Sequence, residues 1–122
     1  MKFSKDGSLP EGWYSNIERS REKANKLLNQ VIVVDLNTSL VVGKLQSVSL
    51  DKLFRLSYPF CKLTLNKAKR YGVDGKYESG SETDQVCFIN KPQMILDLDE
   101  FSRKFPDLHE DISVEIKRGR FD

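Results

Sequence analysis

Residues 62–98 read KLTLNKAKRYGVDGKYESGSETDQVCFINKPQMILDL. Apolar and polar residues alternate over 61–72, which predicts a strand with one buried face. A polar excursion follows over 73–84, and we expect it to be mobile because it has almost no apolar residue that can anchor it. The chain then returns in two apolar runs around the turn Asn90-Lys91-Pro92, which predict strands over 85–90 and 93–98. These segments indicate a small β-rich fold with one long polar loop at its surface.

Two further strands are predicted upstream of this stretch. Residues 31–36 (VIVVDL) are dense in β-branched side chains, and residues 40–50 (LVVGKLQSVSL) follow after the short polar turn 37–39. Strands joined by so short a turn form a hairpin. Gly43 lies inside the second strand and predicts a strong bend or a close approach of two backbones, as small barrels need at their corners.

A helix is predicted before the hairpin. Ser15-Asn16-Ile17-Glu18 matches a capping box, and the helix that it opens runs to about Asn29. The apolar stripe of this helix is short, so we expect the helix to lie on the barrel. Residues 1–14 are predicted to form a flexible leader, in which Trp13 and Tyr14 pack onto the domain.

Two other segments complete the pattern. The segment 51–60 (DKLFRLSYPF) is too apolar for an ordinary loop, and Pro59 argues against a central strand. It either covers an open end of the barrel or presents an apolar patch to a partner. Further on, a short helix is predicted with Asp99 as its N-cap and Pro106 at its end. The alternating residues 112–117 (ISVEIK) predict a sixth strand that can lie at a sheet edge.

The composition indicates one soluble domain inside the cell. The chain has 122 residues, of which 39% are hydrophobic and 31% are charged, a balance typical of globular proteins. No apolar run approaches the roughly eighteen residues of a membrane helix. The N-terminal sequence MKFSKDGSLPEG has no apolar signal core. We therefore expect a cytoplasmic protein, with the nucleus as the alternative, and no membrane partner.

Residue types that carry catalysis or bind metals are sparse. Cys61 and Cys87 are the only cysteines and lie in apolar patterns, so we expect buried free thiols, with a disulfide between paired strands as the less favoured alternative. His109 is the only histidine and lies in a polar context typical of a solvated side chain. No close cysteine pair supports a zinc site, and no nucleophile has a recognisable partner spacing. We expect no enzymatic activity, cofactor, metal or small-molecule substrate.

Two segments resemble Sm-like proteins. Residues 31–51 (VIVVDLNTSLVVGKLQSVSLD) resemble the first Sm motif, in which an apolar strand and a turn precede a glycine. Residues 62–98 are similar to the Sm-like domains of the enhancer-of-decapping and Trailer-hitch proteins. The similarity lies in three features: the basic sequence Lys69-Arg70-Tyr71-Gly72 at the end of the strand predicted over 61–72, which we call the basic corner, then Phe88, and the ending Ile95-Leu96-Asp97-Leu98. The ataxin-type Sm-like domain is the second choice.

This resemblance implies a mainly β fold, a small, strongly bent, five-stranded antiparallel barrel with an N-terminal α-helix over one end. The barrel and its helix would comprise residues 15–98. Residues 99–122 would form an extension, a short helix plus a strand, packed on the same domain. The usual Asp-x-x-Met-Asn of ring-forming Sm proteins is replaced by residues 49–53, and the Arg-Gly of the second motif by Ile89-Asn90. A conventional uridine pocket is therefore not expected.

By the same resemblance we expect a non-catalytic adaptor. Domains of the decapping type bind short linear motifs in factors of messenger-RNA decay and translational repression, so the expected partners are protein segments in a cytoplasmic ribonucleoprotein. Such segments bind by strand addition at a sheet edge or as a short helix in an apolar groove. The candidate partner-binding residues are Leu53, Phe54, Tyr58, Phe88, Ile89 and Met94.

Two alternatives stay open. The first is direct RNA binding at a basic corner, by phosphate contacts and base stacking that involve Lys67, Lys69, Arg70, Tyr71, Lys76 and Tyr77. Such binding should weaken steeply with salt, whereas capture of a motif in an apolar groove should not. The second is an Sm-like subunit that pairs edge to edge with another in a ribonucleoprotein assembly complex, through the free edge of 112–117 or 93–98.

Overall fold

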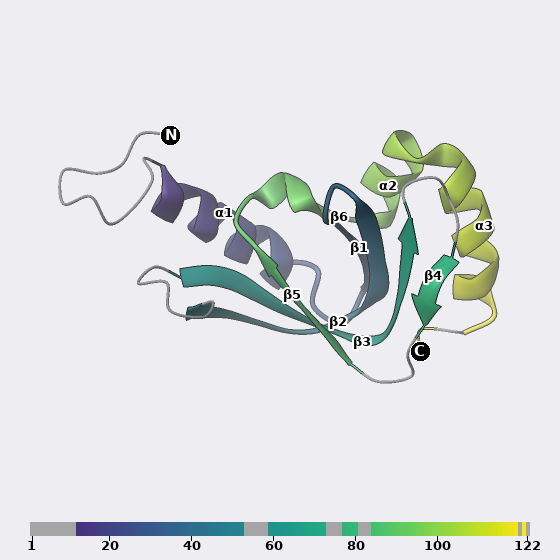
Figure 1. The fold of residues 1–122 in the computed structure, drawn as a ribbon, viewed down its shortest axis with the longest axis horizontal. Coiled ribbons are helices and arrows are strands. Elements are labelled where there is room, and N and C mark those ends of the chain that lie inside the picture. Colours follow the sequence, from purple (N-terminus) through teal and green to yellow (C-terminus); the bar gives the residue numbers. More distant parts are fainter. Residues whose placement is uncertain (1–11, 53–58, 73–76, 81–83, 120, 122) are drawn as a thin grey trace.

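A computed structural model describes residues 12–52, 59–72, 77–80, 84–119 and 121 of the chain (Figure 1). The fold is mainly β, with helices towards both ends of the sequence, as predicted. The elements follow in the order α1 (Trp13–Asn25), β1 (Val31–Asp35), β2 (Ser39–Lys52), β3 (Pro59–Gly72), β4 (Tyr77–Gly80), β5 (Gln85–Ile89), the short 3-10 helix η1 (Pro92–Met94), β6 (Ile95–Leu96), α2 (Leu98–Lys104) and α3 (Pro106–Lys117).

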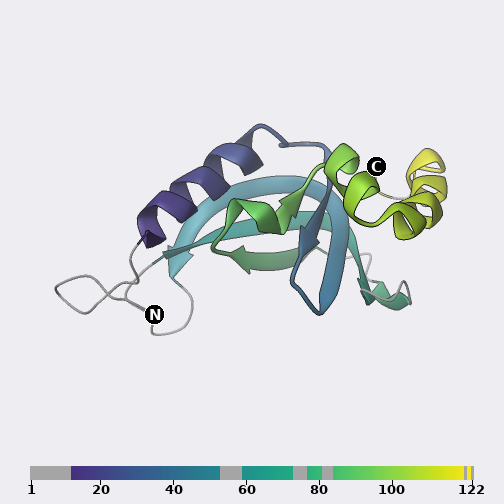
Figure 2. The same cartoon turned by 90° about the horizontal axis from the view of Figure 1, so that it is seen from above.

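One antiparallel sheet contains all the described strands, in the order β4-β3-β2-β1-β6. Strand β5 pairs with the N-terminal half of β3, whereas β4 pairs with its C-terminal end. Strands β2 and β3 have 14 residues each and bend strongly along their length (Figures 1 and 2). The predicted small, strongly bent antiparallel sheet is therefore confirmed. Within the described residues, no pairing joins β6 to β4 or β5.

The five predicted barrel strands correspond to β1, β2, β3, β5 and β6, and β4 is an additional strand inside the polar excursion. The strand predicted over 93–98 is much shorter than expected. Only Ile95 and Leu96 pair with β1, because η1 precedes them and Asp97 already caps α2. The remainder of the excursion, 73–76 and 81–83, and the segment 53–58 lie outside the described residues.

Gly43 lies where β3 approaches β2 too closely to leave room for a side chain. A Cβ atom at this position would lie 3.0 Å from the Leu65 Cβ and 3.1 Å from both the Ala68 Cβ and the Asn66 carbonyl oxygen. The register of β2 against β3 also shifts between Val42 and Lys44. A side chain at residue 43 would separate the two strands where they bend, which explains the glycine and confirms the predicted close approach.

Two clusters of buried side chains form the core, one on each face of β1. Ile32 and Val34 belong to a cluster that includes Ala24 of α1. Val33 belongs to a second cluster, which includes Phe101 of α2 and Ile112 of α3. Successive side chains of a strand point to opposite faces, so the first four residues of β1 are all apolar because both faces of the strand are covered. Figure 2 shows α1 over one arm of the bent sheet and α2 and α3 at the other end.

Helix α1 begins three residues earlier than predicted. Gly12, with φ 80°, is its N-cap, and no side chain caps the helix, so the predicted capping box at Ser15 is wrong. The Trp13 indole Nε1 instead donates a 2.7 Å hydrogen bond to the Pro59 carbonyl and meets the Phe60 ring edge-on at 5.0 Å. Trp13 therefore packs onto the domain, as expected, and holds the first turn against β3. The helix ends at Asn25 rather than near Asn29.

The strand predicted over residues 112–117 is wrong, because these residues form the second half of α3. Leu108 and Ile112 lie one helical turn apart and are both buried, whereas Val114 is 47% exposed. A strand would place residues 112, 114 and 116 on one face. The second core cluster instead contains Leu108 and Ile112, with Ile116 packed against it, and these residues are spaced four apart, as on one face of a helix. Helix α2 ends at Lys104, just before Pro106, as predicted. Pro106 itself occupies the first turn of α3, where its missing N–H costs nothing.

Helix α2 is capped by Asp97 and not by Asp99, so the predicted N-cap is also wrong. The Asp97 carboxylate accepts from the Glu100 amide at 2.7 Å, and the Glu100 carboxylate accepts from the Asp97 amide at 3.3 Å. This reciprocal pair is a complete capping box. It turns the chain directly from β6 into α2 and fixes where α2 begins.

Candidate functional site

Strand β5 is an edge strand with apolar residues on its outer face. It pairs with β3 through residues 61–65 and with no other strand in the described chain. Cys87 and Ile89 point into the core, so Val86 and Phe88 point to the opposite face. Val86 is 48% exposed, and Phe88 is half-buried. An exposed strand edge flanked by apolar side chains can accept another strand.

The predicted partner-binding residues fall in three different places. Phe88 lies on the outer face of β5, where a partner can contact it. Ile89 is fully buried in the first core cluster, and Met94 packs against that cluster. Leu53, Phe54 and Tyr58 lie outside the described residues. Val86 was not predicted as a site residue, but it is more exposed than any described member of the predicted set. The alternation of residues 85–89 could have indicated that Val86 shares the outer face of β5 with Phe88.

The basic corner at the end of β3 is joined to helix α3 by one carboxylate. The Lys69 Nζ donates to the Glu115 Oε1, and the Tyr71 hydroxyl donates to the Glu115 Oε2 at 2.6 Å. The Lys69 side chain is 14% exposed and Tyr71 is buried. Two members of the predicted RNA-binding set are thus engaged within the fold. Glu115 was missed because residues 112–117 were predicted to be a strand.

The structure describes the side chains of two other predicted RNA-binding residues, Lys67 and Arg70, and both are half-buried. Lys67 has φ 52° and is half-buried, and the Arg70 guanidinium lies 3.3 Å from the Ser39 hydroxyl oxygen. Lys76 lies outside the described residues, and Tyr77 is described only as the first residue of β4. The structure therefore brings Lys67, Lys69, Arg70 and Tyr71 together along one strand end, with an anionic partner already in place for two of them.

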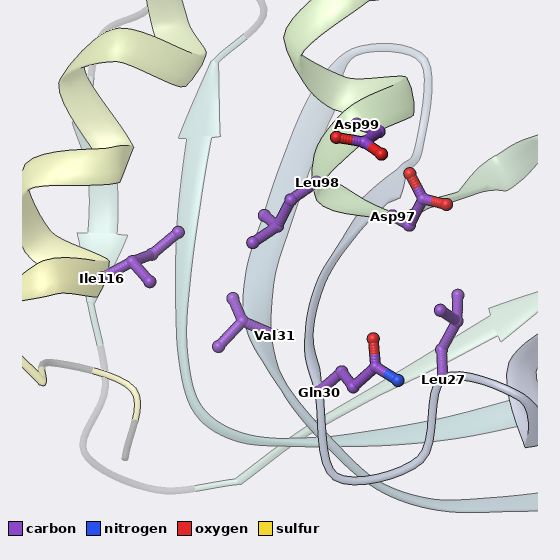
Figure 3. Close-up of a pocket in the computed structure, with 7 residues that line it drawn as sticks. All are labelled: Leu27, Gln30, Val31, Asp97, Leu98, Asp99 and Ile116. Atoms are coloured by element: carbon purple, nitrogen blue, oxygen red, sulfur yellow. The ribbon is translucent and has the colours of Figure 1, made fainter.

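A pocket of about 480 Å³ lies between the segment that leads from α1 into β1, the start of α2 and the last turn of α3 (Figure 3). Its lining consists of Leu27, Gln30, Val31, Asp97, Leu98, Asp99 and Ile116. The apolar side chains form one part of it, and the two carboxylates lie at the α2 end. These residues come from three separate stretches of the chain, so no local sequence pattern predicted the pocket.

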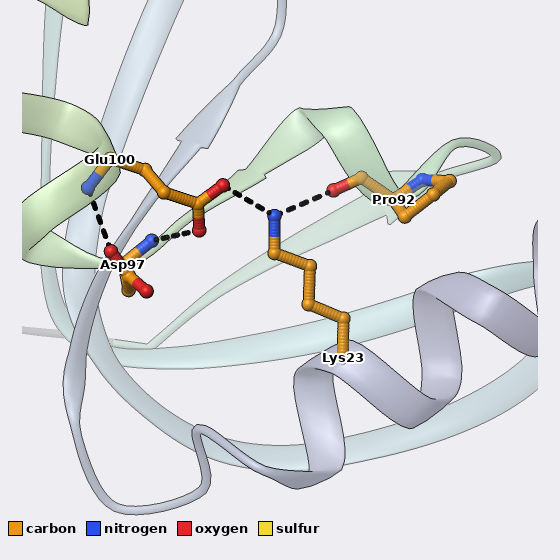
Figure 4. Close-up of polar contacts among 4 residues, drawn as sticks. All are labelled: Lys23, Pro92, Asp97 and Glu100. Carbon is orange, nitrogen blue, oxygen red and sulfur yellow. Dashed lines mark hydrogen bonds and ion pairs between the residues drawn. The ribbon is translucent and has the colours of Figure 1, made fainter. Parts of the chain in front are cut away.

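Lys23 of α1 forms an ion pair with Glu100, an acidic residue of α2 close to the pocket. Its Nζ lies 2.9 Å from the Glu100 Oε2 and donates to the Pro92 carbonyl at 3.3 Å (Figure 4). These contacts tie α1 to both η1 and α2. They also give Glu100 a cationic partner, whereas neither Asp97 nor Asp99 forms an ion pair with any described residue.

The two cysteines are buried, and the single histidine is half-buried. Burial raises the pKa of the Cys61 thiol to about 11, against a lowering effect of Arg21, and burial raises the pKa of Cys87 to about 11, against Arg70. Both thiols are free, which agrees with the prediction.

The His109 ring is half-buried and meets the Phe101 ring edge-on at 5.7 Å, so it is not the solvated side chain that was expected. No group of three or more potential metal ligands occurs within the described residues.

Comparisons with protein-family models, with curated proteins and with solved structures find no match for this chain. Among the helices that the structure describes, none combines the length and the apolar character needed to span a membrane.

Proposed function

We propose that this chain is a divergent Sm-like protein that acts as a non-catalytic adaptor and binds short segments of partner proteins. The order of elements supports the resemblance: helix α1, the hairpin β1–β2 with Gly43 in its second strand, β3, and then β5 and β6 around the η1 turn. By that resemblance the setting is a cytoplasmic ribonucleoprotein of messenger-RNA decay or repression. No step of this proposal requires a cofactor or a reaction.

The observation that carries the proposal is the outer edge of β5. This strand is paired on one side only in the described chain, and it presents Val86 and Phe88 beside that edge. An extended segment can add to such an edge by main-chain hydrogen bonds, while alternate side chains give specificity. A half-buried phenylalanine beside an exposed valine offers the apolar contact that such a segment needs.

Direct RNA binding is the second candidate, and the cluster of Lys67, Lys69 and Arg70 is the observation that favours it. Its weakness is Glu115, which already contacts both Lys69 and Tyr71. A base could stack on Tyr71 only if that buried ring left its present site. Edge-to-edge pairing with another Sm-like subunit is a third candidate and would use the same β5 edge or the outer edge of β6.

The test is affinity purification of the full chain from its own cells, with and without RNase, followed by mass spectrometry. The matched pair of variants is Val86→Lys and Val114→Lys, because Val86 is 48% and Val114 is 47% exposed but only Val86 lies on a sheet edge. A charge at an edge strand opposes the addition of a further strand.

The adaptor proposal expects protein partners that survive RNase, persist in V114K and are lost in V86K. Loss of all partners with RNase would favour RNA binding at the basic corner. Retention of all partners in V86K would exclude the β5 edge as the binding surface. An Sm-like protein among the partners lost in V86K would favour subunit pairing. Circular dichroism of both variants checks that each one is folded.

A further inference from the structure

We propose that the pocket between the end of α1, β1, α2 and α3 binds a cationic side chain, arginine or lysine, together with an adjacent apolar side chain from a short segment of a partner protein. No residue of β5 lines this pocket, so it is a second site, distinct from the edge discussed above. Its volume of about 480 Å³ fits part of a peptide.

The apolar part of the pocket provides contact for an aliphatic stem. In Figure 3 the side chains of Val31, Leu98 and Ile116 face a common space. Val31 and Ile116 also pack against the second core cluster, and Leu27 packs against the first. These side chains are therefore held in position by the two cores. Transfer of a methylene chain from water onto such a surface is favourable, and arginine and lysine commonly pack their stems in this way.

The charges at the pocket select a cation. Asp97 and Asp99 are its only charged lining residues, and no lysine or arginine of the described chain lines it. The Asp97 Oδ1 is occupied by the Glu100 amide, and among the described residues no cation forms an ion pair with this carboxylate. Glu100, in contrast, has Lys23 as its partner. A guanidinium or ammonium group of a ligand would bring a positive charge and hydrogen-bond donors to these two carboxylates.

The same charges argue against other classes of ligand. Two carboxylates oppose a phosphate, which excludes a nucleic-acid backbone from this position. A hard metal ion prefers a shell of several oxygen ligands, but about half of the lining residues here are apolar. The combination of an apolar surface with carboxylates therefore fits an amphipathic cation and favours a basic residue beside an apolar one.

The test is selection of random peptides of about twelve residues, displayed on phage, against the immobilised full chain. The counter-selection uses the double variant Asp97→Asn and Asp99→Asn. Asparagine is as good an N-cap as aspartate, so this variant removes the charges and keeps the start of α2. A matched control, Glu110→Gln with Asp111→Asn, removes two exposed carboxylates of α3 that do not line the pocket.

Enriched peptides should contain arginine or lysine next to a large apolar residue. By fluorescence polarisation they should bind the D97N/D99N variant about tenfold or more weakly than the wild type, because charge-assisted hydrogen bonds are lost. Binding to the E110Q/D111N control should change by less than about twofold. Gln30→Arg should also weaken binding, because it places a guanidinium of the chain itself at the pocket.

Three results would overturn the proposal. The first is enrichment of peptides without a basic residue, or no enrichment at all. The second is equal binding to the wild type and to D97N/D99N. The third is self-association of the wild type that D97N/D99N abolishes, which would make a second copy the occupant. The variant V86K separates the two sites: peptides of this pocket should still bind it, whatever becomes of the β5 edge.

Discussion

The hydroxyl of Tyr71 donates to the Oε2 of Glu115 at 2.6 Å, and this contact joins the end of β3 to helix α3 across 44 positions of the sequence. The other oxygen of the same carboxylate accepts from Lys69. One glutamate thus satisfies two polar groups that the fold places in a largely apolar region. The contact explains how α3 is held against the sheet, and it occupies part of the surface that would otherwise be available to RNA.

Removal of the Tyr71 hydroxyl by Tyr71→Phe should lower the free energy of unfolding by about 1 kcal/mol, the usual net value of one hydrogen bond. Glu115→Ala should cost more, about 2 kcal/mol, because Lys69 also loses its partner. The double variant should be less destabilised than the sum, since both changes break the same contact. Urea denaturation measures all three, with Glu110→Ala as the surface control. Full additivity would show that the two residues do not interact.

Gly43→Ala should destabilise the fold by about 1–3 kcal/mol, because its Cβ would press on Leu65 and Ala68 of β3. Ser49→Ala, at an exposed position of the same strand, should change stability by less than about 0.5 kcal/mol. The free energy of unfolding from urea titrations distinguishes the two. Equal stability of G43A and S49A would mean that the close approach of β2 and β3 is not required.

Asp97→Ala should cost about 1 kcal/mol, the typical effect of losing an N-cap, while Asp97→Asn should be close to neutral. The reason is that asparagine can still accept from the Glu100 amide. Thermal unfolding of the two variants tests this difference. A destabilisation of the same size in both would indicate that the charge of Asp97, and not its capping hydrogen bond, stabilises α2.

Ile112→Ala should cost about 2–4 kcal/mol, since Ile112 is 1% exposed, and Val114→Ala should cost less than about 0.5 kcal/mol. This contrast follows from the helical conformation of residues 106–117. In a strand, both side chains would lie on the same face and would respond alike. Similar losses of stability in the two variants would therefore contradict the helix.

Cys61 and Cys87 should resist iodoacetamide near neutral pH in the native protein and react after unfolding in urea, because burial raises the pKa of both thiols to about 11. Mass spectrometry of the alkylated chain measures this. Rapid modification of the native protein would contradict the burial of the thiols.

The same pKa values predict how stability depends on pH. The thiol pKa rises on folding from 9.0 to about 11, so this contribution to stability is complete below pH 9 and is lost as the pH rises towards 11. Cys87→Ala removes one such group and should make the decline of the unfolding free energy shallower by up to about 1.4 kcal/mol per pH unit. Fluorescence of Trp13, the only tryptophan, can follow the unfolding.

Local sequence was sufficient to predict those elements whose conformation depends mainly on residues that are close together in the chain. The hairpin of β1 and β2 follows from two β-branched runs around a three-residue turn, and the strand pattern of β3 and β5 from alternation. Gly43 marked a close approach of strands because only glycine lacks the atom that would prevent it. For the site, the sequence predicted Phe88 as a partner-binding residue, but it indicated neither the pocket nor Glu115, since both depend on elements that are distant in the chain.

The sequence by itself determined a β-rich chain with a bent hairpin and an N-terminal helix, because periodicity and turn residues act within a few positions. Only the tertiary structure decided residues 112–117, whose apolar positions satisfy a strand as well as a helix that continues from Leu108. Burial of Leu108 and Ile112 in the second core cluster selected the helix. Tertiary packing also selected Gly12 over Ser15 as the N-cap of α1, because the indole of Trp13 gains both a hydrogen bond and an aromatic contact with β3.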